Sequence, residues 1–514
     1  MSTESLQAGS EVSEHPCVPR EPPVSPPPRA RFRLRADLRP VLVPLVIAIV
    51  FGLFSGALAL RERRSDHLHG DEVEYLLQAR ALRTDHDLIM NNEFLDPGDA
   101  YPVPPTFKLV AGEPFIASFM PGQPALLILP DLIGGATGAV LWAAALWTSA
   151  GVALFLYLHR VLGTWPALGA TGVAGLSVPL AWHAASLFTE IPALVLLILA
   201  LLLTQVAAPR RPHALGAALI LAALPWLHQK YGFLAAGIAA ALLLQAPWRR
   251  YTVILIGVVL GSAAGTIAFA EAVRGTPYYT PPPALADSRQ YALHGLALFF
   301  DRNHGIVPIA PIWLVAGTGA LVALRHPKLR PILATNAVAV FLFVAVYLAG
   351  LQYEHGEMPP GREMISLVPI LTLCLGIVLH FLRGAVGKVV VAVAAGGSMA
   401  AGTLTAFLAT PDMFFNNAGR PKLLLTLSAR GLSLPQLFPD LSWPQPRGTK
   451  ALALDLGVLA LLTVLLYFQT DTVRSGTPPA IRPPRLRRSA LDRLRLPRSV
   501  RLFIRQRSGG SRRT

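Results

Sequence analysis

Long apolar stretches separated by short polar loops are the feature that most constrains this sequence. A membrane-spanning helix needs about 20 predominantly apolar residues, with about 17 to 25 tolerated. Of the 514 residues, 53% are hydrophobic and 14% are charged, against about 25% charged residues in soluble domains. The sequence therefore predicts an all-α polytopic membrane protein. It has about 12 candidate transmembrane helices, near 41–60, 136–158, 165–186, 189–207, 213–229, 231–247, 252–270, 306–324, 331–350, 364–382, 389–409 and 451–468.

The basic residues predict which side of the membrane each loop occupies. Five short loops on one side contain ten basic residues and no acidic residue, whereas the loops on the other side contain 16 basic and 20 acidic residues. Because cytoplasmic loops are enriched in Lys and Arg, the basic side is predicted to be cytoplasmic, and both termini lie there. The basic residues are Arg160, Arg210, Arg211, Arg249, Arg250, Arg325, Lys328, Arg330, Arg383 and Lys388.

The two ends of the chain differ from its apolar body. Residues 1–40 are rich in Pro, Ser and Arg, which predicts a disordered cytoplasmic segment. Residues 471–514 form an Arg-rich cytoplasmic tail, which is expected to bind anionic lipid headgroups and not nucleic acid. The apolar stretch 123–135 is too short to cross the membrane and predicts a re-entrant or interfacial segment.

Polar chemistry is concentrated in the external loops, above all in the first one, 61–122. Its densest acidic stretch ends at Asp71 and Glu72 and is followed by a segment with helical periodicity. A carboxylate at the membrane surface can take a proton from an acceptor hydroxyl or hold a divalent cation. A capping box of Asp71 with Glu74 is the alternative for this position, and the two roles are compatible. The helix is expected to place one apolar face in the acyl region, with Tyr75, Leu76, Ala79 and Leu82 on it.

Metal binding at this loop has only a weak signal. Asp71, Glu72 and His69 can be combined as ligands of a divalent cation, and His67 lies next to them. Histidines of a solvated loop are the competing interpretation. No cofactor is otherwise indicated, because the chain has neither a Walker motif nor a dinucleotide-binding glycine motif. The two cysteines, Cys17 and Cys374, fit no metal-type spacing.

Further polar residues occur at the predicted outer ends of later spans. Arg and Lys there can neutralise a lipid phosphate, and a second acid can assist at the same site. The structural alternatives are a plain turn for Glu190 and snorkelling of Lys230 to the interface. The candidate substrate-binding residues are Glu190, His228, Lys230, Arg302, His304 and Arg362.

Several of these segments, in this order, resemble the GT-C superfamily of integral-membrane glycosyltransferases. The sequence is similar to an uncharacterised bacterial branch, distantly related to protein mannosyltransferases and aminoarabinose transferases. The matching segments are Gly-Asp-Glu-Val-Glu-Tyr-Leu-Leu (70–77), Thr-Asp-His-Asp-Leu (84–88), Asn91-Asn92, Met-Pro-Gly-Gln-Pro-Ala-Leu-Leu-Ile-Leu-Pro (120–130), Thr-Glu-Ile-Pro (189–192), Pro-Trp-Leu-His-Gln-Lys (225–230), Phe-Asp-Arg-Asn-His-Gly (300–305), Ala310-Pro311 and Pro-Gly-Arg-Glu-Met (360–364).

The resemblance implies a GT-C-like catalytic core over 41–382, with additional C-terminal spans in 383–470 around the external loop 410–450. It implies transfer of a sugar from a polyprenyl-phosphate donor to an acceptor hydroxyl at the extracytoplasmic face of a bacterial inner membrane. The acceptor is a glycan, a lipid or a protein of the cell envelope. Asp71 falls where such enzymes have their base, with Glu72 beside it. Basic groups corresponding to Lys230, Arg302 and Arg362 usually face the lipid phosphate.

Two other classes of protein compete with this interpretation. A lipid or polysaccharide transporter without catalysis explains the spans equally well, but it leaves the acids collected in an external loop unexplained. An O-antigen ligase or polymerase is expected to use Arg and His in a large late external loop. Here 410–450 contains Arg420 and Arg430 but no His, which disfavours that class.

Overall fold

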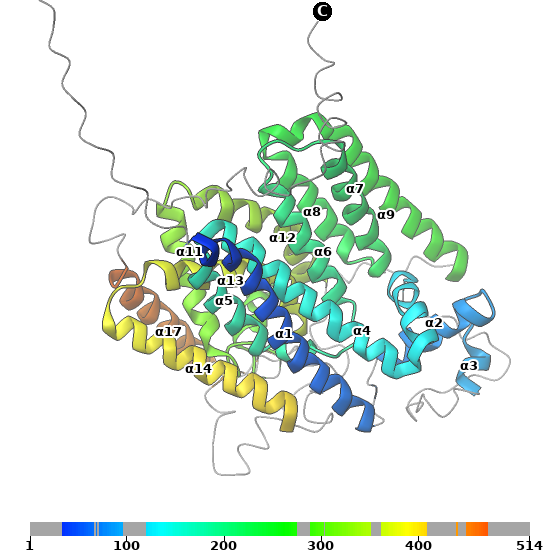
Figure 1. Ribbon diagram of the computed structural model, residues 1–514, viewed down its shortest axis with the longest axis horizontal. Helices are drawn as coiled ribbons and strands as arrows, with labels where there is room; N and C mark the ends of the chain where they lie inside the picture. Colours follow the sequence, from blue (N-terminus) through cyan, green and yellow to red (C-terminus); the bar gives the residue numbers. More distant parts are fainter. Residues whose placement is uncertain are drawn as a thin grey trace, which may run out of the picture. The chain divides into compact units, whose positions relative to one another are not determined.

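Helices make up the regular structure of this protein throughout the part that the structure describes (Figure 1). The computed structural model describes residues 33–65, 68, 71–95, 120–274, 288–302, 304–350, 361–408, 438–439, 441 and 449–470. The α-helices are α1 (Arg33–Ser65), α2 (Asp71–Thr84), α3 (Asn91–Leu95), α4 (Gly122–Leu162), α5 (Thr164–Leu176), α6 (Glu190–Thr204), α7 (Arg211–Leu227), α8 (Tyr231–Leu243), α9 (Thr252–Arg274), α10 (Ser288–Phe300), α11 (Val315–Arg325), α12 (Arg330–Gly350), α13 (Val368–Phe381), α14 (Ala385–Leu408) and α17 (Thr449–Phe468). Short 3-10 helices are η2 (Ala181–His183), η3 (Ala246–Tyr251), η4 (Pro311–Leu314) and η5 (Arg362–Leu367).

Contacts divide the chain into two units, Met1–Val43 and Pro44–Thr514. Helix α1 passes from the first unit into the second at Pro44, and the second unit holds the other helices. Several expectations fall on residues outside the described part. These are the segment 1–40 as far as residue 32, the whole tail 471–514, His69, and nearly all of the loop 410–450.

The prediction of a polytopic all-α membrane protein is confirmed. Within the described residues, six helices are long and apolar enough to cross a membrane, and four shorter apolar helices accompany them. The six long ones are Leu42–Arg61, Gly122–Leu162, Ala246–Val273, Arg362–Phe381, Ala385–Leu408 and Lys450–Phe468. Large apolar side chains point outward from them, including Val253 with 85% and Leu461 with 68% of the side chain exposed. Such outward faces suit contact with lipid tails.

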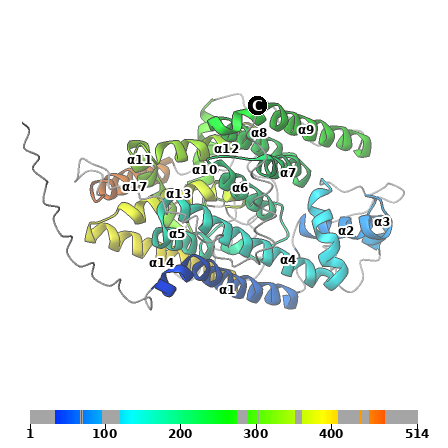
Figure 2. The ribbon, with the colours of Figure 1, turned by 45° about the horizontal axis from the view of Figure 1, so that its top comes forward.

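The helices pack closely wherever small residues face a neighbour. Helices α7, α8, α9 and α12 lie together in both views (Figures 1 and 2), and α8 packs most extensively on α12. A side chain at Gly237 of α8 would collide with the backbone carbonyl of Ala339 in α12. Helices in a membrane associate through such small residues because lipid supplies no hydrophobic drive for their contact.

Helix α4 contains a break where the sequence predicts the boundary of a span. Gly135 has φ 59° and ψ −149°, and Pro130 lies one turn before it. The segment 123–135 therefore forms a separate helical piece ahead of the predicted span 136–158. Only glycine adopts this backbone conformation readily, because a Cβ atom would clash with its own backbone.

The predicted span 165–186 is wrong in its second half. Helix α5 ends at Leu176, and the chain then runs through turns to the start of α6. Two indole N–H groups donate to backbone carbonyls in this segment: Trp147 to Leu180 O at 2.8 Å, and Trp313 to Val178 O at 2.7 Å. Irregular backbone at membrane depth is tolerated where protein groups satisfy it. Apolar composition alone predicts a helix here, because it contains no information on the hydrogen bonds from Trp147 and Trp313.

The helix expected in the first external loop exists as α2, but its apolar face does not lie in the acyl region. Tyr75, Leu76 and Ala79 are completely buried in the protein, and α2 packs against α4. On its other side Val73 and Leu77 form a core cluster with further buried residues of the same loop. Both sides of α2 are covered, so the amphipathic spacing reflects packing within the protein and not contact with lipid.

Candidate functional site

A cluster of charged residues lies where the first residues of four elements meet. Asp71 is the first residue of α2, Glu190 of α6 and Arg362 of η5, and Lys230 directly precedes α8. Acidic side chains are favourable at helix N-termini, whereas cations are not, because the backbone N–H groups there carry partial positive charge. The two cations therefore depend on the two carboxylates for their stability.

Ion pairs join these four side chains into one chain of contacts. Lys230 Nζ donates to Glu190 Oε1 at 2.9 Å, and Arg362 Nε donates to the same oxygen at 3.0 Å. Arg362 Nη2 donates to Asp71 Oδ2 at 2.9 Å. The guanidinium also stacks on Phe188, with its carbon 4.0 Å from the ring centre. Arg362 is thereby fixed in orientation between two acids.

The four side chains differ in their access to solvent. The exposed fraction is 3% for Glu190, 12% for Arg362, 18% for Lys230 and 33% for Asp71. Of the two carboxylates, Asp71 is thus the one that an incoming molecule can reach. Glu190 instead holds the two cations in place from beneath.

Burial and charge set the protonation of two neighbouring groups outside the spans. Burial disfavours the charged ammonium of Lys230, but the Glu190 carboxylate outweighs that effect and raises the pKa of Lys230 above its ordinary value. Burial, together with the charge of Asp71, raises the pKa of Tyr75 well above its ordinary value. Lys230 is therefore a permanent cation at neutral pH, and Tyr75 a neutral phenol.

Glu72, predicted beside Asp71, is directed into the turn before α6. Its Oε1 accepts a hydrogen bond from the backbone N–H of Leu187 at 2.7 Å. Gln123 Nε2 donates to the carbonyl of the same residue at 2.5 Å. These two contacts, from α2 and α4, hold the segment that carries Phe188 and Glu190.

The remaining predicted residues, His228, Arg302 and His304, lie on turns around the cluster. The Nδ1 atom of His228 accepts from the backbone N–H of Lys230 at 3.2 Å. His304 and Arg302 lie on a turn held by Asp301, whose carboxylate accepts from the backbone N–H groups of His304 at 3.0 Å and of Leu441 at 2.7 Å. The carbonyl of His304 accepts from Gly361 N–H at 2.8 Å. This turn therefore reaches Arg362 through the backbone.

Within the described residues, no group of three or more His, Cys, Asp or Glu side chains is placed to hold a metal ion. His69, the expected third ligand beside Asp71 and Glu72, lies outside them. Asp71 is paired with Arg362, and Glu72 is directed at the Leu187 backbone. Each of the two carboxylates thus has a protein partner of its own.

Two residues of the site escape sequence reasoning. Glu363 follows Arg362, and its Oε2 is buried and accepts no hydrogen bond within the described part of the chain. His183 is completely buried, with its Nδ1 2.9 Å from Pro179 O and its ring centre 6.0 Å from that of Phe188. Glu363 could have been noticed as an acid at the start of a predicted span. His183 has no such signal, since it falls within a stretch that is predicted to be a helix.

The fold and the cluster define a polytopic all-α membrane protein with a buried charged site at one end of its helices. No family model and no curated protein matches the sequence. Among solved structures, the chain is similar to ArnT from Cupriavidus metallidurans in the apo state, with a TM-score of 0.46 and 14% sequence identity, over 84% of this chain and 76% of that chain.

Proposed function

We propose that the protein is a membrane glycosyltransferase that moves a sugar from a polyprenyl-phosphate donor to an acceptor hydroxyl at the extracytoplasmic face. The observation that carries the proposal is the buried arrangement of two carboxylates and two cations, of which Asp71 is the most exposed. Such a set can neutralise a phosphate and accept a proton in one place. The sequence resemblance to GT-C enzymes supports the same reaction.

The two cations bind the phosphate of the donor. Lys230 supplies a point charge, and the planar guanidinium of Arg362 can hydrogen-bond two oxygens at once. Both now share Glu190 Oε1, so a donor phosphate would compete with that carboxylate for their N–H groups. Neutralising the phosphate makes it a competent leaving group, since its negative charge is balanced as the bond to the sugar breaks.

Asp71 acts as the general base toward the acceptor. Its carboxylate takes the proton of the attacking hydroxyl while the acceptor oxygen bonds to the anomeric carbon and the polyprenyl phosphate departs with the electrons of the broken bond. One displacement inverts the anomeric centre. Glu72 acts as a positioning residue through Leu187, and His228, Arg302 and His304 are proposed to contact the sugar or the phosphate from the surrounding turns.

The test compares a deletion strain complemented with wild type, with Asp71→Asn or with Asp87→Asn. Asp87 is an exposed acid of the same loop, so it matches the charge change away from the cluster. Envelope glycans and lipid-linked sugars are measured by mass spectrometry. Loss of the base is expected to slow transfer by about 10²–10⁴-fold. One sugar then disappears from the glycans and its lipid-linked form accumulates, with Asp71→Asn but not with Asp87→Asn.

Membrane levels of each variant are checked by immunoblot, because loss of the protein imitates loss of activity. Full complementation by Asp71→Asn at normal levels would remove Asp71 as the base and favour the transporter class. A product that retains the anomeric configuration of the donor would exclude the single displacement.

A further inference from the structure

A cavity of about 760 Å³ lies at the other end of the helices that carry the charge cluster. It is lined by the last residues of α4 and α6, by Gln245 after α8, and by the first turns of α12. Helix α6 begins in the cluster at Glu190 and reaches the cavity at Thr204. Its 15 residues span about 22 Å at 1.5 Å per residue, so cavity and cluster are separate sites.

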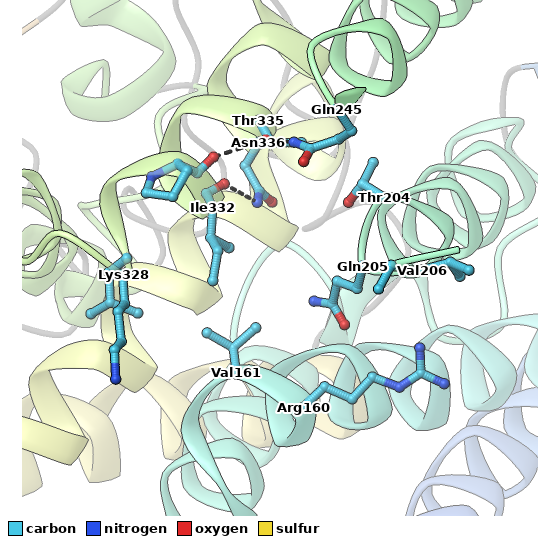
Figure 3. Close-up of a pocket in the computed structure, with 13 residues that line it drawn as sticks. Arg160, Val161, Thr204, Gln205, Val206, Gln245, Lys328, Ile332, Thr335 and Asn336 are labelled. Carbon is cyan, nitrogen blue, oxygen red and sulfur yellow. Dashed lines mark hydrogen bonds between the residues drawn. The ribbon is translucent and has the colours of Figure 1, made fainter. Parts of the chain in front are cut away.

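The lining of this cavity is basic at its edge and amide-rich inside (Figure 3). Arg160 and Lys328 are exposed, and both belong to the loops that are predicted to be cytoplasmic. Gln205, Gln245 and Asn336 also line the cavity, and Asn336 is buried. None of the described residues that line the cavity is acidic. The positive charge at its edge is therefore not balanced by a carboxylate of the lining.

Buried amide atoms in the lining lack partners within the described residues. Asn336 is 2% exposed and donates through Nδ2 to Ile332 O at 2.8 Å, but its Oδ1 accepts no hydrogen bond. Both the Nε2 and the Oε1 of Gln205 are buried without a hydrogen bond. Gln245 differs, because its Nε2 donates to Thr335 at 2.9 Å. Buried polar atoms are normally satisfied, so these three atoms indicate a polar occupant.

We propose that this cavity binds a polyol phosphate. A hydroxyl group both donates and accepts, so it can satisfy the Asn336 Oδ1 acceptor and both atoms of the Gln205 amide. The phosphate lies at the edge of the cavity, where Arg160 and Lys328 supply positive charge from two sides and a dianion or monoanion is favoured. Two sources carry this chemistry: the glycerol-phosphate headgroup of an anionic lipid in the adjacent leaflet, and a soluble polyol phosphate.

The experiment titrates the purified full chain in detergent with phosphatidylglycerol, phosphatidic acid or glycerol 3-phosphate, and follows binding by native mass spectrometry and thermophoresis. Gln205→Leu removes the amide, and it costs no hydrogen bond that the described residues make. Arg160→Gln with Lys328→Gln removes the cations. Arg249→Gln with Lys388→Gln is the matched control, since it removes one Arg and one Lys from exposed positions in η3 and α14, outside the cavity.

We expect saturable binding whose dissociation constant rises about tenfold or more in both cavity variants and stays unchanged in the control pair. Tighter binding of phosphatidylglycerol than of glycerol 3-phosphate assigns the lipid source, and the reverse order assigns the soluble one. Equal weakening in cavity and control variants would show mere surface attraction and overturn the proposal. The absence of saturable binding would also overturn the proposal. So would equal affinities for phosphatidic acid and phosphatidylglycerol, if Gln205→Leu changed neither of them.

Discussion

Both cations of the charge cluster donate to the same oxygen atom. Glu190 Oε1 accepts from both Lys230 and Arg362, and the carboxylate is 3% exposed. Removing one partner of a buried ion pair leaves an uncompensated charge, which costs more than the pair itself contributes. The stability of the site therefore depends more on Glu190 than on either cation.

Replacing Glu190 by Gln is expected to lower the free energy of unfolding by about 3–5 kcal/mol. Lys230 then loses its counter-charge, and Arg362 keeps only the one of its two carboxylates that belongs to Asp71. The measurement is reversible unfolding in mixed detergent micelles. The double variant Glu190→Gln with Lys230→Met is the control: it removes the stranded cation and should regain part of the loss. A double variant that is no more stable than Glu190→Gln would contradict this account.

Replacing Arg362 by Lys keeps the charge but should abolish the bridge between the acids. An ammonium on a flexible stem cannot reproduce donation from Nε to Glu190 and from Nη2 to Asp71 while stacking on Phe188. We expect sugar transfer in the mass-spectrometric assay to fall at least about tenfold, with membrane levels near those of wild type. Wild-type transfer by this variant would mean that charge alone is required.

The raised pKa of Lys230 also predicts a pH dependence. A lysine whose pKa lies above its ordinary value of 10.5 contributes stability that is fully present below that value and is lost as the pH rises through the folded-state pKa. The stability difference between wild type and Lys230→Met should therefore stay constant from about pH 6 to 10. Paired thermal unfolding across that range checks it, and a difference that shrinks near pH 8 would refute the raised pKa.

At the scale of elements, the break in α4 separates the piece that contacts the site from the membrane-spanning piece. Gln123, which holds the Leu187 carbonyl, belongs to the first piece, and Arg160 at the cavity belongs to the second. Gly135, with its positive φ, joins them. The break therefore lets the two pieces of α4 run in different directions.

Replacing Gly135 by Ala is expected to destabilise the protein by about 1–3 kcal/mol, because the conformation is nearly restricted to glycine even though a Cβ atom would meet nothing within 4 Å. The adjacent Gly134→Ala is the matched control. Gly134 also has open space around a Cβ atom but no positive φ, so alanine there should stabilise the helix by up to about 1 kcal/mol. Equal effects of the two changes on unfolding would argue against strain at Gly135.

The sequence predicts the spans well and the connections between them poorly. Apolar length identifies the apolar part of α1 (Leu42–Arg61) and the helices α9, α14 and α17 within a few residues, because the thickness of the bilayer sets that length. The turns after α5 are missed since Trp147 and Trp313, which satisfy them, lie far away in the chain. Asp71, Glu190, Lys230 and Arg362 are each predicted as polar groups of one membrane face. Their pairing cannot be read from one dimension, because Glu190 and Arg362 are 172 positions apart.

At the scale of the whole molecule, the basic loops predict that the cavity and the charge cluster face opposite compartments. Glu271, near the end of α9, and Lys388, near the start of α14, are exposed on the predicted outer and cytoplasmic sides. In a Cys17→Ser background, Glu271→Cys should react with an impermeant thiol reagent in intact spheroplasts. Lys388→Cys should react only after lysis. The buried Cys374 is 4% exposed and should contribute no background.

Reaction of Lys388→Cys in intact spheroplasts, with Glu271→Cys protected, would reverse the orientation. The charge cluster would then face the cytoplasm, and the external donor proposed above would have no access to it. The outcome thus decides between compartments for both sites at once.

The wide separation of the paired residues also shapes how the protein is made. Asp71 leaves the ribosome 291 residues before Arg362, which at 5–20 residues per second takes about 15–60 s. Glu190 and Lys230 emerge during that interval. Asp71 can therefore pair with Arg362 only after most of the chain has been synthesised. A nascent chain that stalls before η5 therefore presents its carboxylates without Arg362. The ion pairs of the cluster are therefore completed only after Arg362 has been synthesised.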